Sequence, residues 1–261
     1  MTQNRSTAVM QRRHEPHDSL DYFPTPPWAT RALCERLAEY KSISDQIVWE
    51  PACGEGHMAR PLGEYFASVF ASDVHDYREA FLGQSEVCDF LCSWDHPEDH
   101  IYDWVITNPP FKLAEQFIDT ALTRARFGVA IFVRTSFLEG KGRYERIFSL
   151  NPPTMIVQFS ERVPLVKGKL DEKASSATSY CWIVWLKNAG IGTFFKWIAP
   201  CRKLLEKPGD YVAGGVDPQL DGQQYEDACR VDDLIREERA EIDRAAKRDA
   251  DGKNEFELGS G

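Results

Sequence analysis

The chain has 261 residues, a formal net charge of −10, 43% hydrophobic residues and 28% charged residues. This balance is ordinary for a water-soluble globular protein. The sequence contains no run of about 18 apolar residues, which a membrane-spanning helix would need. The acidic net charge argues against indiscriminate electrostatic binding to nucleic acid, although a local basic face on an acidic protein can still bind phosphates.

The beginning of the chain and its cysteines indicate the compartment. The first 20 residues are polar, lack the apolar core of a secretion signal and are predicted to be disordered. The seven cysteines are an odd number, and none is arranged as C-x-x-C. The closest pair, Cys88 and Cys92, has no accompanying His or Cys residues at metal-ligand spacing. We therefore expect reduced thiols in a cytoplasmic protein with no metal site and no membrane partner.

Secondary structure is predicted from residue 25 onward. A helix should follow the stretch "YFPTPPW", with Thr25 as its N-cap before two prolines. Short apolar strands and helices then alternate, which favours a doubly wound, mostly parallel α/β sheet. Helices are expected at residues 55–66 and 113–125. Seven strands are expected, and they lie at or within residues 46–52, 68–73, 85–90, 102–107, 127–138, 154–165 and 179–187.

The pattern changes after about residue 190. The following residues are rich in Gly, Pro and acidic side chains and predict a loop, followed by an exposed charged helix at 227–250. Opposite charges at i,i+4 spacing, such as Asp232 and Arg236, support such a helix. We therefore expect a disordered N-terminus (1–20), one α/β domain (21–190) and an acidic loop-plus-helix extension (191–261).

Four features fall at the carboxyl ends of four successive predicted strands, the edge at which open α/β sheets bind ligands. The first is "WEPACGEG", in which the strand ends at Glu50 and is followed by Gly54 and Gly56. These glycines allow a tight turn and a close approach of a ligand to the backbone. A third glycine and a Lys-Ser/Thr pair are absent, so neither the dinucleotide fingerprint nor the P-loop fits. An ordinary turn explains the motif equally well.

The next two strands end in acidic residues. Asp73 closes the second strand, where a carboxylate can accept hydrogen bonds from two ribose hydroxyls. The third strand ends in Asp89 and Phe90. That carboxylate can accept from the amino group of an adenine, and the neighbouring ring can pack on the purine. Each feature alone is equally compatible with a strand-end turn or a helix cap.

The fourth feature is the end of "YDWVITNPPF". Proline has no N–H to donate, so Pro109 and Pro110 end the strand and stiffen the backbone. The amide oxygen of Asn108 and the carbonyl of Pro109 can accept the two hydrogens of a planar amino group. Phe111 can stack on the ring that carries that group. A proline turn alone would explain the prolines but not the amide and the aromatic ring.

The order of "FPTPPW", "EPACGEG", Asp73, "CDF" and "NPPF" resembles the S-adenosylmethionine-dependent adenine-N6 DNA methyltransferases in which cofactor motifs precede the Asn-Pro-Pro-aromatic motif. The resemblance covers residues 20–187, and the Asn-Pro-Pro-Phe motif is its most specific part. It implies a Rossmann-like class I methyltransferase fold, S-adenosylmethionine as cofactor and DNA as partner. It also suggests a compact enzyme of the kind found in phages, prophages and restriction–modification systems.

The resemblance also implies roles for single residues. Asn108 and Pro109 would bind the target amino group, Pro110 would keep the loop rigid, and Phe111 would stack on the flipped base. Within the cofactor site, Phe23, Pro24 and Thr25 would close over the methionine part. Asp73 would hold the ribose, and Asp89 and Phe90 would contact the adenine. The other implied cofactor-binding residues are Glu50, Ala52, Gly54 and Gly56.

Several points stay open at this stage. Basic stretches around residues 134–146 and 162–173 are candidates for phosphate contacts. The chain has only short loops for sequence recognition, so a dimer, a partner subunit or loose specificity is expected. The Asn-Pro-Pro-aromatic motif also resembles enzymes that methylate adenine in RNA or a glutamine amide in a protein. A non-catalytic nucleic-acid-binding subunit is a further alternative, but the intact Asn108 and glycine loop argue against it.

Overall fold

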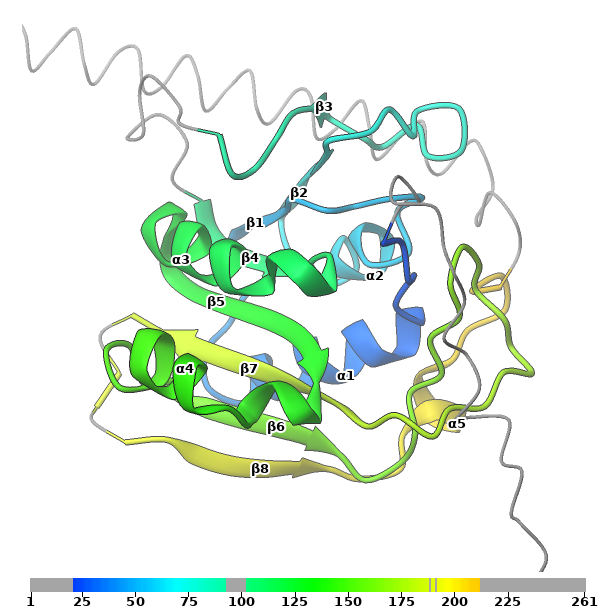
Figure 1. Ribbon diagram of the computed structural model, residues 1–261. Helices are drawn as coiled ribbons and strands as arrows, with labels where there is room; N and C mark the ends of the chain where they lie inside the picture. The colour runs from blue at the N-terminus through cyan, green and yellow to red at the C-terminus, as the bar shows by residue number, and fades with distance from the viewer. Residues whose placement is uncertain (1–20, 93–101, 188, 191, 212–261) are drawn as a thin grey trace, which may run out of the picture.

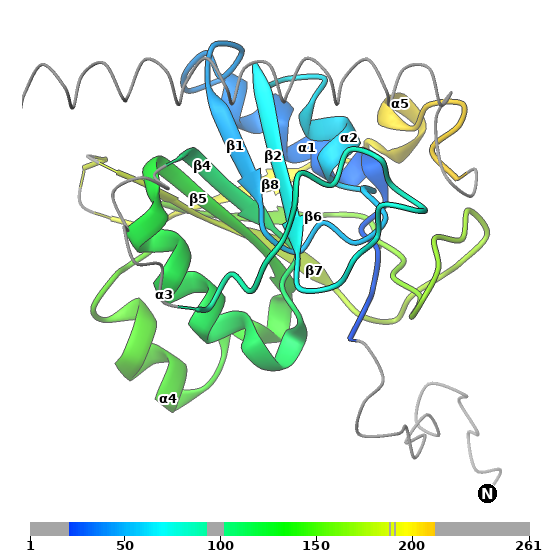
Figure 2. The same ribbon diagram turned by 90° about the horizontal axis from the view of Figure 1, so that it is seen from above.

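The computed structural model of the protein describes residues 21–92, 102–187, 189–190 and 192–211 (Figure 1). These residues form one eight-stranded sheet with helices on both of its faces (Figures 1 and 2). The strands are β1 (Ile47–Glu50), β2 (Ser68–Asp73), β3 (Glu86–Val87), β4 (Tyr102–Thr107), β5 (Ala125–Arg134), β6 (Met155–Phe159), β7 (Tyr180–Leu186) and β8 (Phe194–Ile198).

The sheet has the order β3-β2-β1-β4-β5-β7-β6-β8. Every described pairing is parallel except those of β7, which runs antiparallel to both β5 and β6. The chain order reverses between β1 and β4, and this switch point is where doubly wound sheets bind ligands. The doubly wound, mostly parallel sheet predicted from the sequence is therefore confirmed.

Strand β8 was not expected, because a loop was predicted after residue 190. It pairs with β6 at the edge of the sheet, so the sheet has eight strands rather than seven and extends past that boundary. Four of its five residues are exposed, among them Phe194, Phe195 and Trp197. An edge strand with so little burial has no alternating pattern that sequence reasoning could detect.

Helices cover the two faces of the sheet in separate groups. One face carries α1 (Pro27–Ala38), α2 (Ala59–Leu62) and α5 (Arg202–Leu205), and the other carries α3 (Ala114–Arg124) and α4 (Lys141–Arg143) (Figure 2). The remaining short helical turns are η3 (Phe111–Leu113), η4 (Thr135–Leu138) and the π-helical η5 (Tyr144–Phe148). Within the described ranges, no helix has both the length and the apolar character that crossing a bilayer requires.

Three predicted elements differ from the structure. The helix expected at 55–66 is reduced to the single turn α2, because Gly54 and Gly56 adopt left-handed backbone angles before it. The third strand is reduced to two residues, β3. Thr25 is not the cap of α1, since the Pro26 carbonyl accepts from the Ala29 N–H and no side chain among the described residues caps the helix. The predicted disordered N-terminus and the charged helix at 227–250 lie outside the described residues.

The core has two halves, one on each side of the sheet. The central strands β5 and β7 contribute to both, because alternate residues point to opposite faces. Phe132 and Trp182 pack on the α1 side, whereas Ile131 and Ile183 pack on the α3 side. Burial on both faces explains why these strands are continuous apolar runs in the sequence.

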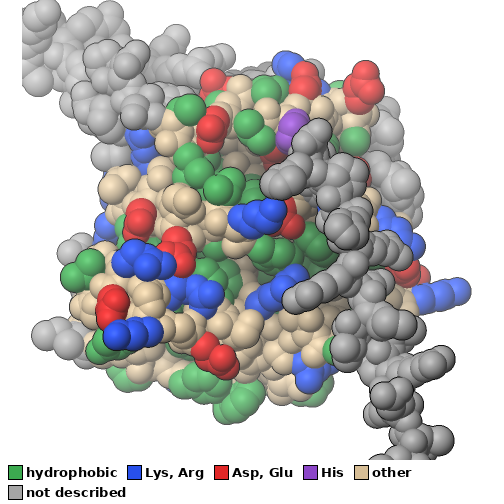
Figure 3. Space-filling model, in the orientation of Figure 1, with side chains coloured by type: hydrophobic (Ala, Val, Ile, Leu, Met, Phe, Trp, Pro, Cys, Tyr) green, Lys and Arg blue, Asp and Glu red, His purple; other side chains and the backbone are tan. Residues whose placement is uncertain are grey.

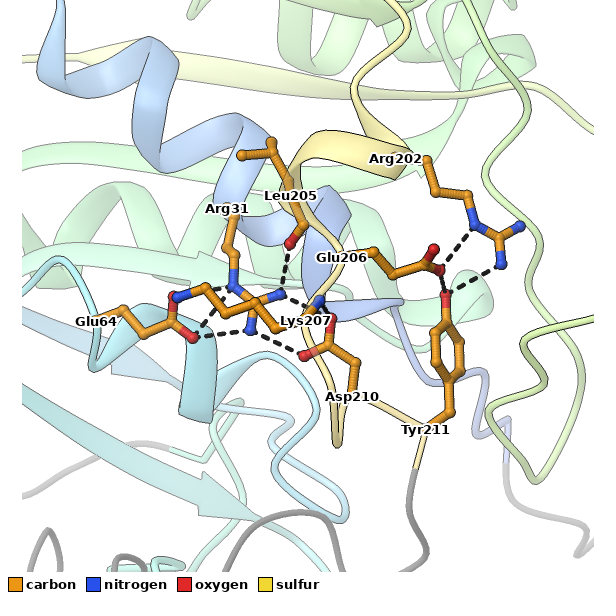
Figure 4. A network of polar contacts seen from close by, with 8 residues as sticks. All are labelled: Arg31, Glu64, Arg202, Leu205, Glu206, Lys207, Asp210 and Tyr211. Carbon is orange, nitrogen blue, oxygen red and sulfur yellow. Dashed lines mark hydrogen bonds and ion pairs between the residues drawn. The ribbon is translucent and has the colours of Figure 1, made fainter.

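A buried arginine connects α1 to the C-terminal part of the described chain (Figure 4). Arg31 is 4% exposed, and its guanidinium pairs with Glu64 at 2.8 Å and with Asp210 at 2.7 Å. It also donates to the carbonyl of Leu205 at 2.7 Å, and Lys207 pairs with Glu64 at 2.7 Å. Because both carboxylates and a carbonyl satisfy the buried cation, α1 is held in one position against α2 and residues 205–210.

The packing of Gly128 in β5 against Trp104 generates a stability prediction. A Cβ at residue 128 would lie 2.4 Å from the indole ring, whose Nε1 donates to Gln46 at 2.6 Å. We expect Gly128→Ala to lower the free energy of unfolding by about 1–3 kcal/mol, since the anchored ring must shift. Urea denaturation measures this. Gly190→Ala is the control, because nothing lies within 4 Å of its added Cβ, and an equal loss in both variants would contradict the prediction.

Candidate active site

The segment 21–25, which we call the strap, precedes α1 and lies against the Asn-Pro-Pro-Phe loop at the end of β4. Three hydrogen bonds join them. The backbone N–H of Phe111 donates to Asp21 Oδ2 at 2.7 Å. Asn108 Nδ2 donates to the Phe23 carbonyl at 2.8 Å and to Thr25 Oγ1 at 3.0 Å. Alternate residues of the strap therefore hold the loop that the sequence indicates as catalytic.

The intervening strap residue, Tyr22, contacts other parts of the site. Its ring packs on Gly54, where an added Cβ would lie 2.5 Å from a ring carbon. Its hydroxyl accepts from the Glu55 N–H at 3.4 Å, and its carbonyl accepts from the Gly168 N–H at 2.9 Å. Burial raises the pKa of the Tyr22 phenol well above its usual value. The strap thus contacts the glycine loop (residues 53–57) as well as the Asn-Pro-Pro-Phe loop.

The carboxamide of Asn108 is held in one orientation. The Phe23 carbonyl can only accept a hydrogen bond, so the NH₂ side of the amide must face it. The opposite atom, Oδ1, is buried and has no hydrogen-bond partner among the residues that the structure describes. Among the described residues, no N–H or O–H donates a hydrogen bond to the carbonyl of Pro109 either. Two acceptors thus remain free at the end of β4.

The glycine loop follows β1 and is braced by Asp73 at the end of β2. Gly54 and Gly56 have φ angles of 50° and 78°, which residues other than glycine rarely adopt. One Asp73 oxygen accepts from the Gly54 N–H at 3.0 Å, and the other accepts from the His75 N–H at 3.0 Å. Burial raises the pKa of Asp73, although these backbone N–H groups act in the opposite direction.

Glu50 lies at the end of β1 below these loops and is fully buried. Its Oε1 accepts from the Thr107 hydroxyl at 2.7 Å, which joins the ends of β1 and β4. Its Oε2 has no partner within the described ranges. Burial raises the pKa of Glu50 to about 8, and the Thr107 hydroxyl opposes this rise only partly. A carboxyl group in this state is largely protonated at neutral pH.

A cavity of about 410 Å³ opens between the strap, the glycine loop and the Asn-Pro-Pro-Phe loop. Its size falls within the roughly 300–1,000 Å³ that is usual for small-molecule sites. The residues that line it are Asp21, Tyr22, Phe23, Pro24, Thr25, Ala52, Cys53, His57, Met58, Asp73, Val74, His75, Tyr77, Asn108, Pro110, Lys112 and Leu113.

The residues predicted from the sequence divide into three groups. Those that line the cavity are Phe23, Pro24, Thr25, Ala52, Asp73, Asn108 and Pro110. Those that belong to the surrounding strand ends and loops without lining it are Glu50, Gly54, Gly56, Pro109 and Phe111. Asp89 and Phe90 are not brought to the cavity. Phe90 is 1% exposed and packs in the core, 4.9 Å from the Trp49 ring, while Asp89 accepts from the Leu91 N–H within a turn.

Sequence reasoning missed several lining residues. Tyr22 and Tyr77 both line the cavity and their ring centroids lie 5.8 Å apart, and His75 is two residues beyond Asp73. His57 and Met58 continue the glycine loop. The signal available for all of them was adjacency to a recognised motif, because each lies within four residues of one.

Phe111 is flanked by a ring and a cation. The Phe23 ring lies 5.0 Å away at a 38° tilt, and the Arg134 guanidinium lies 4.4 Å from the ring centroid. Figure 3 shows further Lys and Arg side chains on the face that carries α3 and α4, with acidic side chains among them. Two of these basic residues, Arg143 and Arg146, pair with Glu115. The aromatic ring is therefore set beside a basic but partly neutralised surface.

The strand order defines the fold class. Strands β3-β2-β1-β4-β5 follow the doubly wound order, and an antiparallel β7 lies between β5 and β6. This is the arrangement of the Rossmann-like class I methyltransferase fold.

No protein-family model and no curated protein matches the sequence. Among solved structures, the chain is similar to a modification subunit of a candidate type I restriction enzyme from Vibrio vulnificus, at 15% identity and a TM-score of 0.49. The match covers 74% of this chain and 50% of that protein. A candidate RNA methyltransferase from Pyrococcus horikoshii matches 68% of the chain over 94% of its own length, at 16% identity and 0.48. Magnesium protoporphyrin IX methyltransferase from Synechocystis with bound S-adenosylmethionine matches 61% of the chain over 78% of its own length, at 13% identity and a TM-score of 0.42.

The raised pKa of Glu50 predicts how stability depends on pH. The pKa rises from 4.5 to about 8 on folding, so the folded protein binds more protons than the unfolded chain between these values. The free energy of unfolding should therefore fall as pH rises through this window, by at most about 1.4 kcal/mol per pH unit from this group. In Glu50→Gln, which mimics the neutral carboxyl, we expect a flatter dependence in urea denaturation between pH 5 and 8.

The control for this experiment is Glu86→Gln in the exposed strand β3, which should keep the wild-type slope. A Glu50→Gln protein with the same pH dependence as wild type would mean that Glu50 is ionised in the folded state at neutral pH.

Proposed function

We propose that the protein transfers a methyl group from S-adenosylmethionine to the N6 amino group of adenine in DNA. The observation that carries the proposal is the buried Oδ1 of Asn108, which has no hydrogen-bond partner among the described residues, while the NH₂ group of the same side chain is held by two. Buried polar atoms are almost always hydrogen-bonded, and a free one costs stability. An acceptor held free in this way is suited to a donor that arrives with a substrate.

An amino group on an aromatic ring fits this acceptor. Its nitrogen is a poor nucleophile because its lone pair is delocalised into the ring. Asn108 Oδ1 and the Pro109 carbonyl can take one hydrogen each, which draws the nitrogen toward tetrahedral geometry and localises the lone pair. These residues supply positioning and electrostatic stabilisation rather than a general base.

The methyl donor supplies an electrophilic methyl carbon bound to a sulfonium. A carbon–nitrogen bond forms as the carbon–sulfur bond breaks, and the bond pair passes to the sulfur. The nitrogen then loses one proton to solvent. Cavity walls formed by the strap and the glycine loop would hold the two reactants in line and exclude water.

The residues present fit S-adenosylmethionine. Each Asp73 oxygen accepts one backbone N–H and keeps capacity for a ribose hydroxyl. The left-handed glycines let the backbone approach a ligand closely. The positive charge of a sulfonium suits a cavity to which Asp21 and Asp73 contribute carboxylates. Val74 and Tyr77, which follow Asp73 and line the cavity, offer apolar contacts for the purine in place of the predicted Asp89 and Phe90.

Two features favour a nucleic-acid base as the target. Phe111 follows the two acceptors after one further proline and can stack on a flipped base. Lys112 lines the cavity and Arg134 lies over the Phe111 ring, so two cations beside the site are available for phosphate contacts. A base inside a duplex cannot reach this cavity and must be flipped out, which costs a few kcal/mol. RNA adenine and a glutamine amide share the same chemistry and are alternative substrates.

The test is methyl transfer by the purified chain. Labelled S-adenosylmethionine is supplied with unmethylated DNA, methylation-free RNA or a protein extract in parallel, and digested products are identified by mass spectrometry. N6-methyladenine from DNA alone is the expected result. Label in RNA or in glutamine would overturn the substrate, and bound cofactor without any product would overturn catalysis by this chain alone.

Asn108 should be essential for transfer but not for cofactor binding. We expect Asn108→Ala to lower the transfer rate by at least about 10²-fold, because one of two acceptors for the amino group is lost. Calorimetric titration should give a dissociation constant for S-adenosylmethionine within a few-fold of wild type. Asn151→Ala, an exposed asparagine after η5, is the control. Transfer that persists in Asn108→Ala would remove Asn108 from the mechanism.

Asp73, in contrast to Asn108, should be important for cofactor binding. Asp73→Ala removes the acceptor for the ribose hydroxyls and for the Gly54 N–H, so we expect S-adenosylmethionine to bind at least about tenfold more weakly. Asp76→Ala, three residues further along, is the control, since Asp76 is exposed and pairs with Arg78. Equal affinities in wild type and Asp73→Ala would exclude Asp73 from the cofactor site.

A further inference from the structure

Thr25 carries a hydroxyl that its position in the chain does not explain. A threonine just before a helix usually caps it. Here the N–H of Ala29 in the first turn of α1 donates to the Pro26 carbonyl, and no side chain among the described residues caps the helix. Thr25 is 2% exposed, and its Oγ1 instead accepts from Asn108 Nδ2 at 3.0 Å. The hydroxyl is thus directed at the side chain on which the proposed reaction depends.

Two anchors are needed to fix the plane of a carboxamide. The Phe23 carbonyl determines which side of the amide carries NH₂, because it can only accept. That single bond at 2.8 Å still allows rotation about the last side-chain torsion, which is broad for asparagine. The bond to Thr25 takes the second hydrogen and removes this freedom. Oδ1 is then held at one place.

The strap is itself held rigidly, so it can act as a reference for Asn108. Pro24 restricts the backbone within the strap, and Pro26 and Pro27 restrict it directly after the strap. Its carbonyl at Tyr22 is anchored to Gly168, and Trp28 at the start of α1 is fully buried in the core. Asp21 at its other end fixes the N–H of Phe111. One segment therefore positions both the free acceptor and the stacking ring.

We propose that Thr25 is a positioning residue for Asn108: its hydroxyl, together with the Phe23 carbonyl, fixes the plane of the Asn108 carboxamide so that Oδ1 meets the substrate amino group. The identity of the substrate rests on the proposed function, whereas the contact between the two side chains does not. This role differs from closure over the methionine part of the cofactor, which the family resemblance implies for Thr25.

The first test is kinetic and uses the full chain. Thr25→Val keeps the shape and removes the hydroxyl, and Thr25→Ser keeps the hydroxyl. We expect Thr25→Val to lower kcat by about 10- to 100-fold, since a misplaced acceptor weakens alignment, with the KM for S-adenosylmethionine changed less than about threefold. Thr25→Ser should restore kcat to within a few-fold. Thr25→Ala is run beside them in case the valine variant fails to fold.

Thr30→Val is the matched control. Thr30 lies in α1, is fully buried, and its hydroxyl has no hydrogen-bond partner among the described residues. The same chemical change there should leave kcat as in wild type. A raised KM with unchanged kcat in Thr25→Val would assign Thr25 to cofactor binding instead, and an equal loss in Thr25→Ser would show that the hydroxyl is not what matters. Both results would overturn the proposal.

The second test does not require activity. The side-chain ¹H–¹⁵N signals of Asn108, assigned by their loss in Asn108→Ala, should shift in Thr25→Val and Thr25→Ala and return near their wild-type positions in Thr25→Ser. Unchanged signals in Thr25→Val would overturn the proposal. If wild type methylates none of the substrates offered, the proposed function fails, but these spectra still decide whether Thr25 holds Asn108.

Discussion

The hydrogen bonds between the strap and the Asn108 carboxamide are the interaction on which the rest of the site depends. They convert a flexible amide into an acceptor of fixed direction, and the remaining structure keeps their partners in place. Burial of Trp28 and the bond from Trp182 Nε1 to the Ala29 carbonyl at 3.2 Å hold the first turn of α1 on the sheet. In the same helix, the buried Arg31 network holds α1 against α2 and residues 205–210 (Figure 4). The core therefore fixes the position of α1, α1 fixes the position of the strap, and the strap fixes the orientation of the Asn108 amide.

Carboxylates brace the platform on which the strap lies. Glu50 joins the ends of β1 and β4 through Thr107, and Asp73 joins the end of β2 to the glycine loop through the Gly54 N–H. Three neighbouring strand ends are thus cross-linked by side chains that would otherwise be costly to bury. The burial that makes these bonds strong also raises the pKa of Glu50. Rigidity and a perturbed carboxyl group have the same physical origin here, namely exclusion of water from the switch point of the sheet.

The sequence predicts the elements that show a burial pattern and the site residues that belong to a motif. The central strands were visible because burial on both faces makes them apolar runs, and Asp73 and Asn108 were visible because they end such runs. Strand β8 was missed because an exposed edge strand has no burial pattern. Phe90 shows a different limit, since an aromatic residue at a strand end can face a ligand or the core, and here its ring lies against Trp49. Thr25 shows a third, because local sequence suggested a cap, whereas the contact made by its hydroxyl spans 83 residues of chain.

A site that works by alignment depends on stiffness more than on charge. The carboxylates that line the cavity, Asp21 and Asp73, already accept backbone N–H groups, so each has a bracing role at the end of a loop. An amino group presented to Asn108 needs its two hydrogens accepted at fixed points, and small displacements of those points reduce alignment steeply. Prolines on both sides of the contact, in the strap and after Asn108, restrict the backbone where the acceptors lie. The two proline-rich stretches are far apart in sequence, but in the fold they lie on either side of the hydrogen bonds that hold a single amide.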